Sequence, residues 1–292
     1  MERFTYTRAE SVAHALALLN EPGVRSRVLA GGTDLLLFLR ANPNLCDRVV
    51  DISLIPELHR IERDGKRVTI GAAATFSEII ESPLLQESAP VLVQACRQIG
   101  AVQIRNMGTL GGNVANAAAC ADSLPALVCL DAVATIAAPD PKGSQNSFGS
   151  VNLPVSELVL GPNRTCIPAG GLLSSFSFTV PAAGSRSVFL KLGRRNAMAI
   201  SRLTVAALGR LDAAGRIAEA RLVPGSVAPQ VRRFTTVEAG LLGQPPGEAL
   251  FQAAGQQTAA EMIRITGRRW STGYKEPALI ALVARALRQV LM

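Results

Sequence analysis

The sequence predicts an α+β protein of two unequal parts, and three observations support this. Its 292 residues are enough for about two domains. Up to residue 137, short β-type runs alternate with helical patterns, whereas from residue 187 three β-type runs are followed by two or three helices. A meander of strands followed by helices is typical of α+β domains. The pattern changes around residues 176–182, so we expect a first domain over 1–178 and a smaller second domain over 179–292.

The elements of the first part follow from periodicity and from turn residues. Helical spacing of apolar residues predicts helices at 11–19, 35–40, 76–80 and 89–99. Short β-type runs predict strands at 27–30, 48–52, 67–72 and 132–137. The last of these strands stops at a segment rich in turn residues, Pro139 to Ser150, which we interpret as an exposed loop or hairpin tip.

The second part is predicted in the same way. Strands are expected at 187–192, 199–211 and 217–223, separated by segments with turn residues such as RRNAM and DAAGR. Helices are expected at 235–242, 248–265 and 276–291.

Composition excludes several classes of protein. Apolar residues make up 48% of the chain and charged residues 18%, which excludes a disordered protein, and 4% aromatics argue against a platform for single-stranded nucleic acid. The net charge of +8 comes from arginines in pairs (194–195, 232–233, 268–269) and not from a long basic run. We therefore expect no nucleic acid, and interpret the charge as a docking surface for acidic faces of partner proteins.

Cysteine and histidine usage indicates a reduced compartment and no metal. Five cysteines lie far apart without a C-x-x-C motif, so disulfides are not expected and the predicted location is the cytoplasm. Two histidines in separate contexts supply no metal-ligand spacing. The first twenty residues lack the pattern of a signal peptide, and no window of 18 apolar residues predicts a membrane span.

The first candidate site is the segment from Leu29 to Leu35, where a strand ends in Gly31 and Gly32 just before a helix. Glycines let backbone amides approach a ligand closely, and amides at a helix start favour an anion such as a phosphate. Thr33 adds a hydroxyl, and Asp34 is placed to cap the helix. The alternative is a plain tight turn with a capped helix.

The second candidate is the segment Thr109, Leu110, Gly111, Gly112 and Asn113, followed by a run of small residues. Such a stretch suits backbone lying against a planar or phosphorylated ligand, although tight helix packing explains it equally well. Asp122, an acid among small residues, needs a partner, which ligand hydroxyls would supply. Its alternative role is a cap ahead of Pro125.

The third candidate is Lys191. On a strand starting near Val188, Lys191 shares one face with Phe189 while Leu190 and Leu192 occupy the other. It is either a surface lysine with its stem on apolar residues or a fixed cation beside a ligand. G-x-G-x-x-G, P-loop, H-E-x-x-H and G-x-S-x-G motifs do not occur, so we assign no catalytic residue and no metal ligand to this chain.

Taken together, these segments resemble a known family. AGGTD at 30–34, TLGGNVANAAACADSLP at 109–125, GGLLS at 170–174 and FLKLGRR at 189–195 are similar to the FAD-binding medium subunit of the molybdenum hydroxylases, the xanthine dehydrogenase and carbon monoxide dehydrogenase group. The stretch at 223–243 is similar to the family's second domain, so the resemblance covers nearly the whole chain. It implies an FAD-binding domain of the p-cresol methylhydroxylase type, followed by a smaller C-terminal domain like that of carbon monoxide dehydrogenase flavoproteins.

The resemblance also implies roles for individual residues. Residues 29–35 would hold the FAD diphosphate through backbone amides, and 109–113 would close over it from the other side. Asp122 would contact FAD, Lys191 would lie near the flavin, and Ile99 and Leu172 would make apolar contacts, with Ala74 and Thr75 as further candidates. The candidate cofactor-binding residues are Leu29, Ala30, Gly31, Gly32, Thr33, Asp34, Leu35, Ile99, Thr109, Leu110, Gly111, Gly112, Asn113, Asp122, Leu172 and Lys191.

The implied function is an electron relay. AGGTD holds no His or Cys, and Cys120 has no evident activating base, so we expect noncovalent FAD. The [2Fe–2S] clusters and molybdopterin are expected on partners, an iron–sulfur small subunit and a molybdopterin large subunit, with NAD⁺ or another acceptor taking the electrons. The alternatives are a stand-alone FAD-dependent oxidase or reductase of the same fold, and a basic scaffold or nucleic-acid module.

Overall fold

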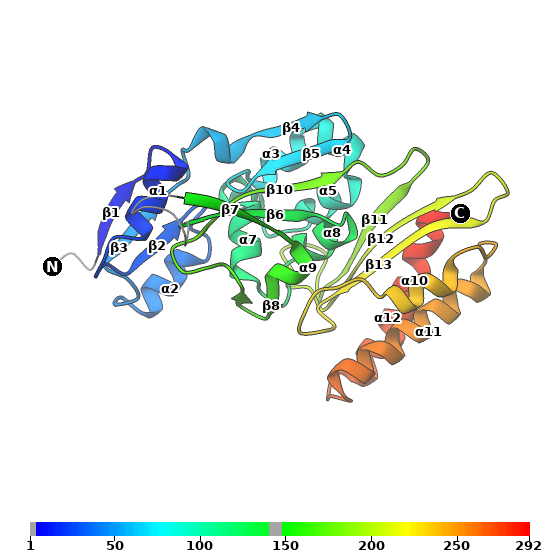
Figure 1. The fold of residues 1–292 in the computed structure, drawn as a ribbon. Coiled ribbons are helices and arrows are strands. Elements are labelled where there is room, and N and C mark those ends of the chain that lie inside the picture. Colours follow the sequence, from blue (N-terminus) through cyan, green and yellow to red (C-terminus); the bar gives the residue numbers. More distant parts are fainter. Residues whose placement is uncertain (1–3, 140–147) are drawn as a thin grey trace.

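The computed structural model describes residues 4–139 and 148–292, which form a larger and a smaller part (Figure 1). The larger part begins with a three-stranded parallel sheet in the order β1-β3-β2. Its elements are β1 (Thr5–Arg8), α1 (Val12–Leu19), β2 (Ser26–Leu29), α2 (Leu35–Ala41) and β3 (Arg48–Asp51). Because parallel strands end at the same edge, the segments that follow Leu29 and Asp51 lie side by side there.

A buried carboxylate stabilises this sheet. Asp51, 5% exposed, accepts hydrogen bonds from the Tyr6 hydroxyl on β1 and from the Ser53 amide at 2.8 Å. Burial alone would raise the pKa of the Asp51 carboxyl, but the bonds from Tyr6 and Ser53 outweigh it and lower that pKa. The charged form therefore contributes to the stability of the sheet.

Replacing Asp51 by asparagine should lower the free energy of unfolding by about 1.5–3 kcal/mol at pH 7, because bonds to a charged acceptor are lost. A carboxyl with a lowered folded pKa stabilises above its unfolded pKa of about 3.9, and the contribution is lost as the pH falls through the folded value. Urea unfolding should thus show a gap between the two proteins at pH 7 that narrows near pH 3. Equal stability at pH 7, or the same loss on replacing the exposed Asp64 by asparagine, would contradict this role.

The middle of the larger part is an antiparallel sheet in the order β4-β5-β10-β6-β7. A cluster of buried apolar residues lies between this sheet and the helices that follow β5. The strands are β4 (Ile61–Asp64), β5 (Arg67–Gly71), β6 (Val133–Pro139), β7 (Phe148–Pro154) and β10 (Leu172–Thr179). The helices are α3 (Phe76–Glu81), α4 (Pro83–Ser88), α5 (Pro90–Arg97), α6 (Val102–Met107), α7 (Leu110–Asn116), α8 (Ser123–Cys129) and α9 (Val155–Leu158), with a 3₁₀ turn at Pro56–His59 and a small ladder of β8 (Val159–Gly161) and β9 (Arg164–Thr165).

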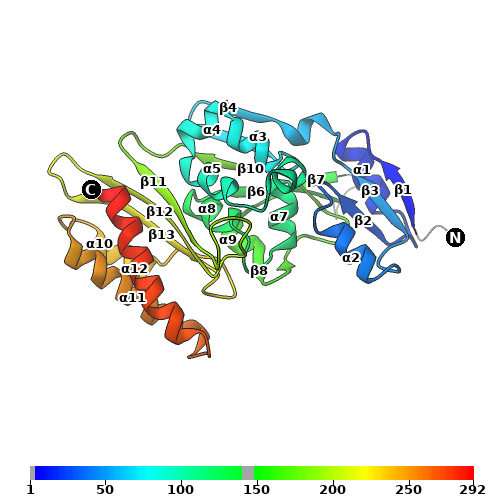
Figure 2. The same ribbon diagram turned by 180° about the vertical axis from the view of Figure 1, so that it is seen from behind.

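The smaller part is an antiparallel sheet, β11 (Arg186–Leu192), β12 (Leu203–Leu211) and β13 (Ile217–Gly225), followed by α10 (Thr235–Leu241), α11 (Glu248–Thr266) and α12 (Thr272–Leu291). Strand β12 is buried on both faces. Val205 and Ala207 pack with the helices of the smaller part, while Ala206 and Leu208 belong to the core of the larger part. The sheet of the smaller part therefore lies between the helices α5 and α8 of the larger part and its own helices, with α12 across the far face (Figures 1 and 2).

The predicted α+β architecture, with antiparallel strands and then helices in the smaller part, is confirmed. Two boundaries were wrong. Strand β12 begins at Leu203 and not at Ala199, because Met198 adopts a positive φ of 52° and the chain folds back so that Ala199 lies against Gly193. Helix α12 begins at Thr272, so Pro277 lies inside it near its start. The predicted loop at Pro139 to Ser150 falls mostly on residues 140–147, outside the described residues.

The sequence also predicted no membrane span, no metal-ligand set and no disulfide. No helix within residues 4–139 and 148–292 is long and apolar enough to cross a membrane. The same residues hold no group of three or more potential metal ligands. All five cysteines are free, and burial raises the pKa of the Cys129 thiol to about 12, so that thiol is unreactive.

Candidate FAD-binding site

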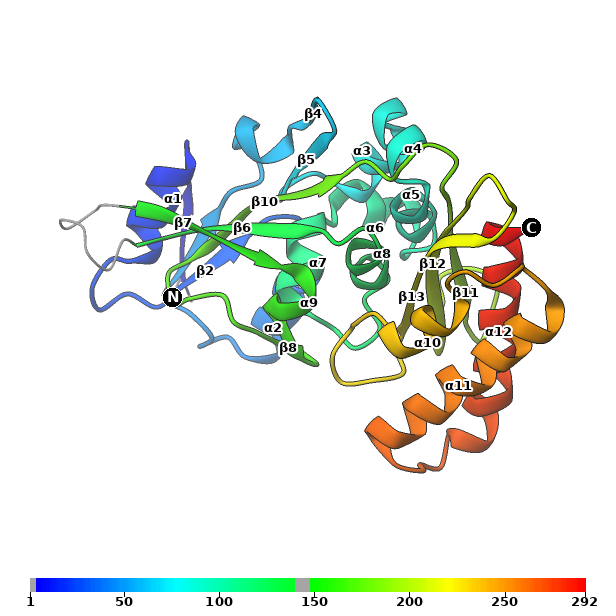
Figure 3. The same cartoon turned by 45° about the vertical axis from the view of Figure 1, so that its right-hand side comes forward.

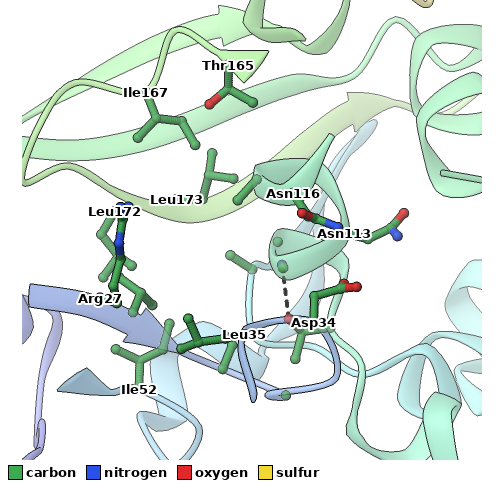
Figure 4. A pocket seen from close by; sticks show the side chains of 18 of the residues that line it. Arg27, Asp34, Leu35, Ile52, Asn113, Asn116, Thr165, Ile167, Leu172 and Leu173 are labelled. Carbon is green, nitrogen blue, oxygen red and sulfur yellow. Dashed lines mark hydrogen bonds between the residues drawn. The ribbon is translucent and has the colours of Figure 1, made fainter. Parts of the chain in front are cut away.

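The two glycine-containing segments, about eighty residues apart, meet at one cavity of about 500 Å³ (Figure 4). One wall comes from residues 26–35 at the end of β2 and the start of α2, and another from residues 108–116 along α7. A third wall is formed by residues 165–173, which lead into β10. This volume is within the range of about 300–1,000 Å³ found for cofactor and ligand pockets.

The turn after β2 presents a row of free backbone donors. Gly32 adopts a φ of +70°, which turns the chain from strand into helix. None of the six amides from Ala30 to Leu35 donates a hydrogen bond to any residue that the structure describes. Five of these six residues, all but Asp34, are half-buried, and N–H groups in such places need acceptors, so this row fits an anion with several oxygens.

The segment at α7 contributes differently, because its amides are already bonded within the protein. Leu110 donates to the Ala74 carbonyl at 2.9 Å and Gly111 to the Ala72 carbonyl at 2.8 Å. Thr109 caps α7 by accepting from the Gly112 amide at 3.0 Å. Residues 109–112 therefore fix the wall of the cavity, and Gly111 is required because a Cβ there would lie 2.6 Å from the Ala72 oxygen.

The two segments touch each other at Gly31. A Cβ placed on Gly31 would lie 1.8 Å from the Met107 carbonyl oxygen and 3.0 Å from Gly108 Cα. No side chain fits between these two stretches of backbone. Gly31 thereby holds the row of free amides against the start of α7.

Most of the predicted site residues line this cavity, but Leu29, Leu110, Ala74 and Thr75 do not. Residues 30–35, Thr109, Gly111, Gly112, Asn113 and Leu172 line it. Leu29 packs instead beside Leu39 and Val49, and Leu110 is fully buried in the main core. Ala74 is also fully buried, and Thr75 caps α3, so both lie behind the wall. The capping role considered for Asp34 is wrong, since its side chain makes no cap hydrogen bond.

Sequence reasoning missed Arg27 and the wall at 165–171. Figure 4 shows the Arg27 side chain beside Leu172, with Thr165 and Ile167 across the cavity. No carboxylate of the described residues lies within ion-pair distance of Arg27. Its place two residues before the end of β2 could have pointed to it, whereas residues 165–169 carry no recognisable motif and Gly170 and Gly171 entered only as part of GGLLS.

Ile99, Asp122 and Lys191 form a second group, apart from the residues that line the cavity. Lys191 Nζ donates to Asp122 Oδ2 at 2.6 Å and to the Gln98 carbonyl at 2.9 Å, next to Ile99. Ser201 donates to the other Asp122 oxygen at 2.5 Å. The pair is almost fully buried, with 7% and 6% of the two side chains exposed. Burial raises the pKa of the Asp122 carboxyl, against the opposing effects of Lys191 and Ser201.

Two alternative roles for these residues are therefore wrong. Lys191 is not a surface lysine, and Asp122 makes no cap hydrogen bond at the start of α8. Instead, the pair joins α8 of the larger part to β11 of the smaller part. Phe189 and Lys191 do share one strand face, as predicted, since Phe189 packs in the main core and Leu190 against the helices.

The residues present fit FAD. The six free amides suit a diphosphate, Arg27 adds a cation, and Ile52, Leu172 and Leu173 supply apolar walls for flat rings. This combination of an anion cradle and an apolar slot is what a dinucleotide requires.

Comparisons with known proteins place the chain in a family. Residues 2–182 match the FAD-binding domain of molybdopterin dehydrogenases, and residues 188–290 match the C-terminal domain of carbon monoxide dehydrogenase flavoproteins. The chain belongs to this family. It is an FAD-binding oxidoreductase subunit of the molybdenum hydroxylase type, as the sequence predicted.

Individual relatives agree with this assignment. The xanthine dehydrogenase FAD-binding subunit of Escherichia coli O157:H7 is 35% identical over 228 residues, which cover 77% of this chain and 74% of the relative. The glyceraldehyde dehydrogenase medium chain of Sulfolobus acidocaldarius is 27% identical over 290 residues, 98% of each chain. A solved structure of carbon monoxide dehydrogenase from Hydrogenophaga pseudoflava superposes with a TM-score of 0.87 at 27% identity, covering 99% of this chain and 97% of the other.

Proposed function

We propose that this chain holds FAD noncovalently in the cavity between residues 26–35 and 108–116, and relays electrons from an iron–sulfur partner subunit to NAD⁺ or another acceptor. The observation that carries the proposal is the row of six free amides from Ala30 to Leu35 at the cavity wall. Bound there, FAD supplies the capacity to exchange electrons singly or in pairs.

The chain's own residues bind and orient the cofactor. The amides of residues 30–35 donate to the diphosphate, and Arg27 balances its charge. Leu172, Leu173 and Ile52 exclude water from the ring surfaces. Lys191 and Asp122 fix the smaller part against the larger one.

The noncovalent mode rests on the lining of the cavity, which includes no cysteine or histidine among the described residues. Cys120 lies in the small-residue run after α7, and burial together with the Asp122 charge raises the pKa of its thiol. The raised pKa leaves little thiolate at pH 7. Attack on the cofactor by this thiol is therefore disfavoured.

The partner subunits complete the proposed relay. A molybdopterin large subunit would oxidise the substrate, and [2Fe–2S] clusters on a small subunit would lead the electrons to this chain. We place the complex in the cytoplasm, in keeping with five free thiols. The relatives named as medium chains and FAD-binding subunits support the same division of labour.

The test is purification of the chain together with its complex. We expect a yellow preparation whose flavin is released completely by acid precipitation as FAD, and co-purification of subunits with iron, sulfide and molybdenum. FAD that remains with the precipitated protein would overturn the noncovalent mode. A solitary chain that oxidises its own substrate at full rate would replace the relay with the stand-alone oxidase or reductase.

A further inference from the structure

The turn between α11 and α12 exposes a large aromatic side chain. Trp270, the single tryptophan of the chain, is 89% exposed. The turn projects beyond the sheet of the smaller part in views from opposite sides (Figures 1 and 2). Figure 3 shows the helical hairpin from a third direction, with its turn again at the edge of the molecule. Tyr274, one helical turn further on, is 47% exposed.

Three cations gather beside these aromatic residues. The Arg202 guanidinium lies over the Tyr274 ring, 5.6 Å from its centroid. Lys275 Nζ donates to the Ser226 carbonyl at 2.7 Å, and Arg269 Nε to the Thr266 carbonyl at 3.2 Å. Within the described ranges, no carboxylate lies within 4.0 Å of any of the three.

Other arginines of the helical hairpin formed by α11 and α12 do pair with carboxylates. Arg268 pairs with Glu276 at 3.1 Å, and Arg264 with Glu261 at 3.4 Å. Glu261 and Glu276 are thus already paired with other arginines. The positive charge of Arg202, Arg269 and Lys275 is left without a counterion from the described chain.

The three cations also repel one another. Burial, and then the charges of Arg202 and Arg269, lower the pKa of the Lys275 ammonium. Holding like charges together costs free energy in the isolated chain. An external anionic group at this place would offset that cost.

Shape and residue type favour a protein surface as the occupant. Trp270 is 89% exposed on a projecting turn and does not line the FAD cavity, whereas small molecules prefer concave sites. Tryptophan, tyrosine and arginine are the residue types that dominate binding at the centre of protein interfaces. Carboxylates on the partner would complement the three cations.

We propose that Arg202, Arg269, Trp270, Tyr274 and Lys275 form a docking patch for an acidic surface of a partner subunit. The inference rests on the proposed function, because the partner is taken to be a subunit of the same complex. Trp270 anchors the contact and the three cations pair with carboxylates around it. This patch lies on α12, its preceding turn and the segment before β12, outside the FAD cavity.

The test uses the full chain labelled with 5-fluorotryptophan, which gives one ¹⁹F resonance from Trp270, and reconstitutes the complex from it. On addition of the unlabelled partner subunits we expect that resonance to shift, and the shift to reverse at high salt. Trp270→Ala should weaken subunit association about 30-fold and Arg269→Glu about tenfold or more. Arg285→Glu, the same charge change at an exposed position on α12, should leave the affinity within about twofold.

The outcomes separate the patch from the proposed function. If the subunits assemble but the resonance does not move and Arg269→Glu binds as the unmodified chain does, the patch is wrong and the relay stands. If no subunit binds, the proposed function fails. A shift produced by duplex DNA, and not by the subunits, would overturn the patch in favour of nucleic-acid binding.

Discussion

Replacing Gly31 by alanine should abolish retention of FAD. The added Cβ would lie 1.8 Å from the Met107 carbonyl oxygen, so the turn after β2 must move away from the backbone at the end of α6. That movement takes the free amides of residues 30–35 off the diphosphate. Losing two charge-assisted bonds of about 1.5–3 kcal/mol each weakens binding by about 100-fold or more. FAD titration of the apoprotein, followed by flavin fluorescence, measures the effect.

A matched control and a second variant make this result specific. Gly149→Ala adds the same methyl group where nothing lies within 4 Å, and should bind FAD normally. Arg27→Met removes the cation of the cavity without touching the backbone and should weaken FAD binding about tenfold. Full FAD content in Gly31→Ala would show that the cofactor does not depend on this turn. Circular dichroism of each apoprotein shows whether the fold is kept.

Replacing Lys191 by methionine should cost about 3–5 kcal/mol of unfolding free energy. The change leaves the Asp122 carboxylate buried, with the Ser201 hydroxyl as its remaining side-chain partner. Since the pair joins α8 to β11, the loss weakens the contact between the two parts of the molecule. Urea unfolding of the apoprotein measures it, so that FAD binding does not contribute.

A double variant identifies the cause of this loss. Lys191→Met combined with Asp122→Leu removes both charges and should recover most of the lost stability, because no buried charge is left unpaired. Ser201→Ala, which removes a hydrogen bond to the same carboxylate, should cost about 1.5–3 kcal/mol. If the double variant is as unstable as the sum of the single variants, the pair is not coupled.

The residues that pointed most clearly to the candidate site are glycines at positions where no other side chain fits. Gly31 and Gly111 stand where a Cβ would overlap carbonyl oxygens, so their spacing records the geometry of the cavity directly. The strand before AGGTD and the helix after it also follow from periodicity. The resemblance to the family implied that these two distant segments hold one cofactor, and the structure brings both of them to one cavity.

Other features could not be read from the sequence, because they depend on tertiary partners. Strand β10 begins at Leu172 and pairs with both β5 and β6, and its register is set by strands far away in the chain. Helix α7 contains Gly111 and Gly112, poor helix formers, and depends on its Thr109 cap and on packing against Ala72. The wall at 165–171 and the role of Arg27 depend likewise on how these segments meet.

Lys191 and Asp122 show that the partner of a charged side chain is hard to predict from sequence. The sequence marked both as candidates for FAD contact, and the structure pairs them with each other across two elements 69 residues apart. Periodicity places a side chain on a face but does not say which charge stands opposite. Their contact with the cofactor stays a prediction.

The double burial of strand β12 restricts how this chain could be divided. Ala206 and Leu208 complete the core of the larger part, so a fragment that ends near residue 182 would leave an uncovered apolar face on α5 and α8. Such a fragment would be prone to aggregate, although the family boundary falls there. Chimeras between relatives must therefore exchange the β11–β13 sheet together with α5 and α8, against which it packs.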